Sequence, residues 1–196
     1  MTRYLSSTVL AAGLALGAGT AVSAEPVAYD VDPSHSEILF AWDHAGFSTT
    51  RGLVFDMTGE IMFDEADPAN SSVSISFPVS AMNVTSGLYE HLMSDDFFGS
   101  EDAMVTFEST SIEVTGDDEA NITGDLTIND TTQEVVLDAE LTQQGEGPMG
   151  DPVAGFEAEA TILRSDYGLG AFAPVVSDEV EVNISLEANP AEQSGG

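Results

Sequence analysis

Residues 179–186 read Glu-Val-Glu-Val-Asn-Ile-Ser-Leu, with an apolar side chain at every second position. Successive side chains of a β-strand point to opposite faces, so this pattern predicts a strand with one buried and one solvated face. Acidic and short polar residues occupy the solvated face, as is typical of antiparallel sheets. The stretch therefore indicates an all-β fold.

The same period recurs along the chain, and turn-forming sequences separate the rows. Apolar rows are predicted at 73–79, 122–128, 135–141 and 156–162. A longer row is predicted at 53–63, and Arg51 would share its inward face. With shorter strands at 27–31, 37–43 and 105–114, we expect an eight-stranded antiparallel, lipocalin-like β-barrel with one short helix at Ser86–Met93. Closure removes exposed edges and leaves room for one slender ligand.

The residues at both ends of the sequence are assigned separately from the predicted barrel. Arg3, an apolar run at 5–22 and the small residues 22–24 predict a cleaved signal peptide at 1–24, and hence a periplasmic protein. An uncleaved anchor helix is the alternative, but Gly and Ala dominate the run. We assign 25–188 to the barrel and 189–196 to a disordered tail.

The composition is strongly acidic and contains no lysine or cysteine. All 35 acidic residues follow residue 24, together with only two arginines, so cleavage would leave a formal charge of −33. This charge disfavours nucleic acid as a partner and is typical of halophilic proteins, whose self-repulsion is screened by salt. With four Tyr and one Trp, the chain also lacks the aromatic girdles of an outer-membrane barrel, so stable membrane insertion is not expected.

Five motifs in register resemble the YceI-like family of periplasmic, lipocalin-like, isoprenoid-binding proteins. They are 32–36, 44–52, 94–98, 123–128, and Gly155-Phe156 followed by 164–170. The resemblance implies a hollow barrel that sequesters or transports an isoprenoid lipid or quinone. One departure is Tyr89-Glu90-His91, where family members commonly carry an Arg-Asp pair, and this weakens the expectation of a phosphate-bearing ligand.

The candidate ligand-binding residues combine the scarce cations and histidines with aromatic bulk and the late arginine turn: His35, Trp42, His44, Arg51, Phe55, Phe98, Arg164, Asp166 and Tyr167. A guanidinium can clamp a headgroup, but a structural ion pair, for example of Arg164 with Asp166, is the competing interpretation. For His35, a structural histidine is the favoured interpretation over ligand binding.

No enzyme motif is present, so binding without turnover is expected. No metal or other cofactor is expected either, because His35, His44 and His91 lack a ligand spacing. The alternative function is a barrel filled by side chains that serves as an envelope stress or interaction module without a lipid ligand. A homodimer is compatible with either hypothesis.

Overall fold

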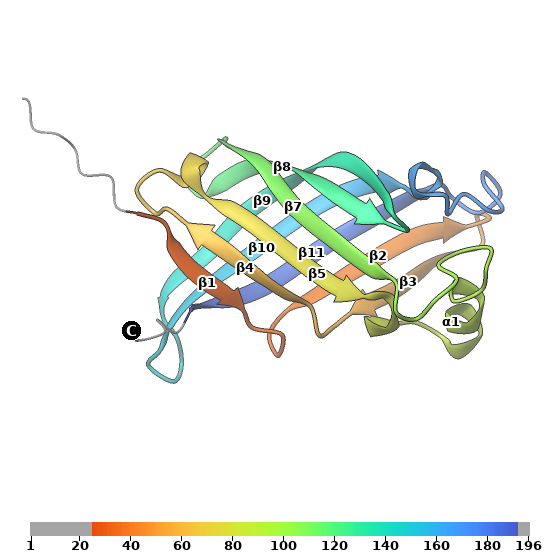
Figure 1. Ribbon diagram of the computed structural model, residues 1–196, viewed down its shortest axis with the longest axis horizontal. Helices are drawn as coiled ribbons and strands as arrows, with labels where there is room; N and C mark the ends of the chain where they lie inside the picture. Colours follow the sequence, from red (N-terminus) through yellow and green to blue (C-terminus); the bar gives the residue numbers. More distant parts are fainter. Residues whose placement is uncertain (1–24, 192–196) are drawn as a thin grey trace, which may run out of the picture.

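The computed structural model describes residues 25–191, which form one antiparallel sheet of eleven strands (Figure 1). The proposed signal peptide at 1–24 and residues 192–196 lie outside the described residues. The strands are β1 (Val27–Val31), β2 (Glu37–His44), β3 (Ser48–Val54), β4 (Thr58–Phe63), β5 (Ser72–Pro78), β6 (Met82–Asn83), β7 (Met104–Val114), β8 (Glu119–Ile128), β9 (Thr131–Glu146), β10 (Pro152–Leu163) and β11 (Glu179–Pro190).

Pairing of β1 with β11 closes the sheet, in the order β1-β4-β5-β7-β8-β9-β10-β11. The predicted eight-stranded antiparallel barrel is therefore confirmed. β2 pairs with the first half of β11 and β1 with its end, so β1 and β2 act as one broken barrel strand. β2 is followed by β3 and β6 on its other side.

The two ends of the barrel carry different connections between the strands (Figure 1). One end, called here the α1 end, carries the β2–β3 turn, the predicted helix α1 (Ser86–Leu92) and the long β10–β11 connection at 164–178. The opposite end, called here the far end, carries the β4–β5, β7–β8 and β9–β10 turns. A twelve-residue strand such as β10 spans about 40 Å along its own direction, and strand tilt shortens the barrel to about 30 Å.

The prediction of one continuous strand at 53–63 is wrong. The chain breaks between β3 and β4, where Asp56 has a positive φ of 55°. Val54 and Met57 are both buried, at 1% and 0% exposure. They are an odd number of residues apart, so the inward-facing positions change from even-numbered in β3 to odd-numbered in β4. Leu53 and Phe55 consequently lie out of register with Met57, and the predicted common face for Arg51 and Met57 does not form.

The tail also begins later than predicted. Asn189 and Pro190 belong to β11, where they pair with Asp30 and Tyr29. The Ala191 N–H then donates to the Ala28 carbonyl at 2.8 Å. These last residues complete the closure of the barrel, which explains why their polar, proline-containing sequence is ordered.

Packed side chains fill only parts of the interior. Near the far end, Tyr29, Phe63 and Phe156 pack edge to face, with ring centroids 6.3 and 5.9 Å apart. Toward the α1 end, a second cluster includes Val54, Met57 and Tyr167. The rest of the barrel interior, enclosed by the inward-facing side chains of the strands, is a cavity.

Candidate ligand-binding cavity

The barrel encloses a cavity of about 1240 Å³ that reaches from one end to the other. This volume exceeds the roughly 300–1,000 Å³ of common small-molecule sites. The predicted inward rows of five strands line it: Val73, Ile75 and Phe77 of β5; Ile122, Leu126 and Ile128 of β8; Val135, Leu137 and Leu141 of β9; Phe156, Ala158, Ala160 and Ile162 of β10; and Val180, Val182, Ile184 and Leu186 of β11. The interior is thus hollow, as the family resemblance implies.

Many of these inward side chains stay half-buried even though they point into the barrel, among them Ile122, Val135 and Val180. They have no side chain opposite them to cover their surface. Unfilled apolar surface of this kind forfeits both the hydrophobic gain and the dispersion contacts of a packed core. An apolar ligand would supply both.

The cavity wall on β2 is aromatic. Phe40 and Trp42 stack with centroids 5.9 Å apart and an interplanar angle of 9°, and both line the cavity. Gly52 of β3 lies opposite Phe40, and a Cβ on Gly52 would approach the Phe40 ring to 2.3 Å. Glycine at this position therefore leaves the space into which the Phe40 ring packs.

A second aromatic group lies at the α1 end. His91 of α1 has its ring centroid 4.8 Å from Phe97 and 5.8 Å from Phe172, and all three line the cavity. Phe98 follows Phe97 and lines it as well. The group joins α1 and its following turn to the 164–178 connection across this end of the barrel.

The two ends of the cavity differ in charge. At the α1 end its lining includes His44, His91, Arg51 and the hydroxyl residues Thr49 and Thr50. At the far end the lining includes the acidic turn residues Asp117 and Asp118; Glu119, Glu140 and Glu157 also border the cavity, but strand alternation places their side chains on the outer face. The α1 end therefore offers hydrogen-bond donors, whereas the ionised carboxylates of the far end only accept.

Arg51 touches the rim of the cavity, but alternation places its side chain on the outer face. It pairs with Ala41, whereas the inward pairs are Phe40 with Gly52 and Trp42 with Thr50. The Arg51 guanidinium makes one long bond of 3.5 Å to the Thr49 carbonyl. Among residues 25–191, neither arginine lies within 4.0 Å of a carboxylate.

Arg164 has a structural role that differs from the expected ion pair. It lines the cavity at the start of the 164–178 connection. Its Nε donates to the Ser177 carbonyl at 2.8 Å, and its two terminal nitrogens donate to the carbonyls of Leu169, Ala171 and Val176. Burial lowers the pKa of the guanidinium, and the charge of Asp178 partly opposes this shift. Arg164 thus holds the connection together and has few donors left for a headgroup.

Tyr167 lines the cavity with its ring and is 2% exposed. Its hydroxyl is the one buried side-chain polar atom without a hydrogen-bond partner in the described part of the chain. Burial, with a smaller effect of Asp166, raises the Tyr167 pKa to about 12. Asp166 itself is exposed and does not line the cavity; its carbonyl accepts a bond from Gln133 at 3.1 Å.

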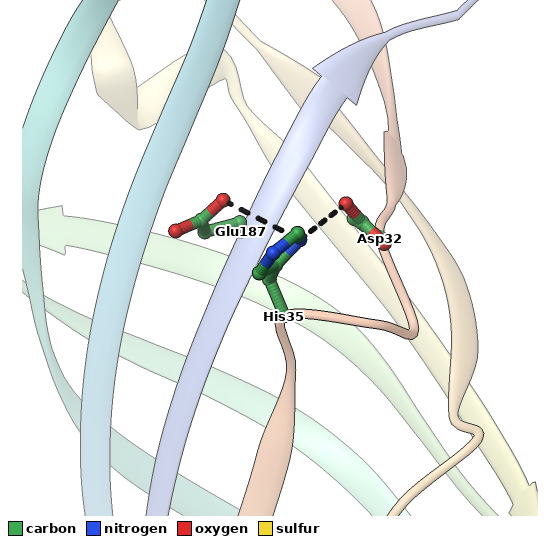
Figure 2. Close-up of side chains that lie close together, drawn as sticks. All are labelled: Asp32, His35 and Glu187. Carbon is green, nitrogen blue, oxygen red and sulfur yellow. Dashed lines mark hydrogen bonds and ion pairs between the residues drawn. The ribbon is translucent and has the colours of Figure 1, made fainter. Parts of the chain in front are cut away.

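His35 lies away from the cavity, at the corner between β1 and β2 (Figure 2). Its Nδ1 lies 2.9 Å from Asp32 Oδ2 and 3.9 Å from Glu187 Oε2 of β11. The bond to Asp32 and the two carboxylate charges raise the pKa of His35, and the bond from His35 lowers that of Asp32 to about 2. The structural interpretation of His35 therefore fits better than ligand binding.

These three residues are also the one group within 25–191 whose ligand atoms, all within 4.8 Å of one another, could together hold a cation. The grouping does not include His44 or His91, so the structure does not assemble the three histidines into a metal site. Exposed acidic groups often lie close together without binding a metal ion, so this grouping does not test the expectation of no metal. That expectation remains a prediction.

The predicted ligand-binding residues thus divide into two sets. Trp42, His44, Arg51, Phe98, Arg164 and Tyr167 line the cavity, whereas His35, Phe55 and Asp166 do not. Phe55 is excluded because the break at Asp56 shifts its strand register. Sequence reasoning did not single out Phe40, Thr50, His91 or Phe172 as site residues; the alternation of β2 with Trp42 could have identified Phe40.

A family model described as a YceI-like domain matches residues 29–188. The chain belongs to the YceI-like family. A YceI protein of Escherichia coli (strain UMN026) is 36% identical over 178 residues, covering 90% of this chain and 92% of the relative.

YceI-like barrels also occur among solved structures. The YceI protein of Campylobacter jejuni aligns with a TM-score of 0.68 and 29% identity, covering 76% of this chain and 90% of that one. A polyisoprenoid-binding domain of Saccharophagus degradans has a TM-score of 0.58 and 16% identity, with 84% and 99% coverage, and shares the fold. Within the described residues of this YceI-like protein, no helix has the length and apolar character needed to cross a bilayer.

Proposed function

We propose that this YceI-like protein is a binding protein that sequesters an isoprenoid amphiphile in its barrel and carries it, without turnover, through the aqueous periplasm. The observation that carries the proposal is the apolar cavity of about 1240 Å³ running the length of the barrel. An isoprenoid is long, slender and apolar, and each methylene equivalent that it buries contributes about 0.8 kcal/mol. The occurrence of this fold in a polyisoprenoid-binding domain of Saccharophagus degradans is consistent with that ligand class.

The distribution of donors favours one orientation of the ligand. A quinone carbonyl only accepts hydrogen bonds, so it needs the imidazoles and threonine hydroxyls of the α1 end. The far end presents the acidic turn residues Asp117 and Asp118, whose carboxylates would repel a carbonyl oxygen. The polar head therefore lies near His44, Thr50 and His91, and the hydrocarbon tail points toward the far end.

The same residues favour a neutral head over a phosphate. Arg164 is bonded to four backbone carbonyls, and the Arg51 side chain starts on the outer face of β3. No lysine is present, and the chain carries a formal charge of −32. A doubly charged phosphate would therefore enter the barrel without a dedicated cation to pair with. A quinone or a prenol fits this site better.

The test has two parts. Native mass spectrometry of protein purified from its own host, followed by lipid extraction, should identify a neutral isoprenoid. The delipidated protein should then be titrated with a prenol, an isoprenoid quinone and a polyprenyl phosphate, using fluorescence of Trp42, the single tryptophan, which lines the cavity. We expect the phosphate to bind at least about tenfold more weakly than the prenol. Tight phosphate binding would refute the neutral head, and binding of no isoprenoid would refute the proposed function.

The alternative of a side-chain-filled interaction barrel is not favoured by this cavity. It would require the inward rows of β8 to β11 to meet across the interior, whereas they line open space. The acidic exterior fits an exported protein of a saline environment under either function.

A further inference from the structure

Among residues 25–191, three of the four most exposed large apolar side chains lie at the α1 end of the barrel. Phe47 is 90% exposed, Val175 69% and Phe172 60%. Phe47 lies in the β2–β3 turn, and the other two lie in the 164–178 connection. At the far end the comparable residue is Met149, 89% exposed in the β9–β10 turn. Folding alone does not explain the exposure of two phenylalanines on such a polar surface.

These three residues, called here the apolar rim, lie on adjoining segments. The Ser177 N–H donates to the Asp43 carbonyl at 3.0 Å, and His44 forms a β-bridge with Val176. The β2–β3 turn and the 172–177 segment are therefore held side by side (Figure 1). Phe172 and Val175 also line the cavity, whereas Phe47 does not. Apolar surface thus continues from the outside of the protein into the cavity at this end.

We propose that the apolar rim docks the α1 end on the surface of a lipid bilayer, so that the ligand passes between membrane and cavity without crossing water. This inference rests on the proposed lipid-binding function, because a membrane is the reservoir of an isoprenoid. Aromatic side chains are suited to the bilayer interface. In the ligand orientation inferred above, the polar head lies at the α1 end, next to the rim and hence at the level of the bilayer interface.

Charge determines which membrane fits. Asp43 lies beside the rim, and Glu90, Asp95 and Asp96 surround α1 at the same end. Carboxylates so close to the contact repel anionic lipids. Docking on a bilayer of low net charge, by insertion of the rim, is therefore the geometry that fits. Salt should leave binding to such a bilayer in place, and it should strengthen binding to an anionic bilayer, because there it screens the repulsion without weakening the apolar contact.

The experiment uses flotation of the protein with phosphatidylcholine vesicles, at about 0.1 and about 1 M NaCl. We expect binding to phosphatidylcholine at both salt concentrations, and binding that weakens when phosphatidylglycerol is added, more strongly at the lower salt concentration. Phe47→Ser should lower the vesicle affinity about tenfold, as expected for removal of one inserted phenyl ring. Met149→Ser is the matched control, with an equally exposed apolar side chain at the far end, and should leave vesicle binding unchanged.

Two further measurements separate the possible failures. Prenol binding followed by Trp42 fluorescence should be equal in wild type and Phe47→Ser, because Phe47 lies outside the cavity. Equal loss of vesicle affinity in Phe47→Ser and Met149→Ser, or no vesicle binding by a protein that does bind prenol, would overturn docking and leave the proposed function intact. Sedimentation showing that the rim instead joins two copies of the chain would also overturn docking. Absence of prenol binding would remove the proposed function itself.

Discussion

Filling the cavity with a side chain should separate its role in ligand binding from its role in stability. Ala158 and Ala154 lie on the same strand, β10, in opposite surroundings. Ala158 is half-buried and lines the cavity, and its pairing partners Ile184 and Ala139 line it too. Ala154 is fully buried in the cluster with Tyr29 and Phe63, next to the fully buried Ala188. The test substitutes phenylalanine at each position.

In Ala158→Phe the new ring enters open space of about 1240 Å³ and displaces no protein atoms. Full burial of a phenylalanine side chain is worth about 1.5–3 kcal/mol; partial burial in the cavity should therefore change the stability by between zero and about +2 kcal/mol. In Ala154→Phe the ring must displace packed neighbours, which costs about 1–3 kcal/mol. The two variants should thus differ by about 1–5 kcal/mol, and at about 2–4 °C per kcal/mol for a chain of this size the thermal midpoints should differ by roughly 2–20 °C.

The assay pairs thermal unfolding with prenol titration. Ala158→Phe should unfold at or above the wild-type midpoint yet lose at least about tenfold in prenol affinity, whereas Ala154→Phe should lose stability. If Ala158→Phe destabilised the protein as much as Ala154→Phe does, the interior would be filled, and the argument from the cavity would be refuted.

Four further expectations follow from charge and hydrogen bonding. The thermal midpoint should rise by many degrees between about 0.05 and 1 M NaCl, because 35 acidic residues repel one another in dilute buffer; a salt-independent midpoint would contradict halophilic stability. Arg164→Gln should cost about 3 kcal/mol, since it leaves backbone carbonyls of the 164–178 connection without their donor; denaturant unfolding measures this, and a near-neutral result would remove the structural role. The His35–Asp32 pair should stabilise the protein most at mildly acidic pH. The contribution of His35 is present below about 6.5 and is lost as the pH rises through its raised pKa. The contribution of Asp32 is lost as the pH falls from 3.8 toward the lowered pKa of about 2. Asp32→Asn should accordingly lower the midpoint more at about pH 5 than at about pH 8. EDTA or Zn²⁺ should leave the midpoint unchanged; stabilisation by Zn²⁺ that His35→Gln abolishes would show that Asp32, His35 and Glu187 bind a cation.

The sequence predicted the walls of the barrel better than its corners. The rows of β5 and β8 to β11 were correct because an unbroken two-residue period determines which face is buried. The break at Asp56 was missed because no Pro or Gly marks it, and only the positive φ of Asp56 reveals the shift. That shift removed Phe55 from the site and turned Arg51 outward.

Contacts between distant segments were also beyond the sequence. Arg164 was recognised as unusual in an acidic chain, but its partners are backbone carbonyls, which carry no mark in the sequence. Glu187 reaches His35 only because β11 changes its pairing partner from β2 to β1 at this corner. The composition of the site was therefore predictable where it follows strand alternation, and not where it depends on the corners and on the 164–178 connection.

The hollow interior and the acidic exterior together make the stability of this barrel depend on its surroundings. The cavity withholds apolar contacts that a filled core of the same size would make, and the charges destabilise the compact state when salt is low. A ligand that binds only the folded barrel restores stability by mass action, about 2.7 kcal/mol when its concentration is a hundred times its Kd. Delipidated protein at low salt should therefore be the least stable form, and salt and ligand should each recover part of the loss by independent mechanisms. Their effects on the free energy of unfolding should add, because salt acts on the outer carboxylates and the ligand acts on the inward rows of the barrel.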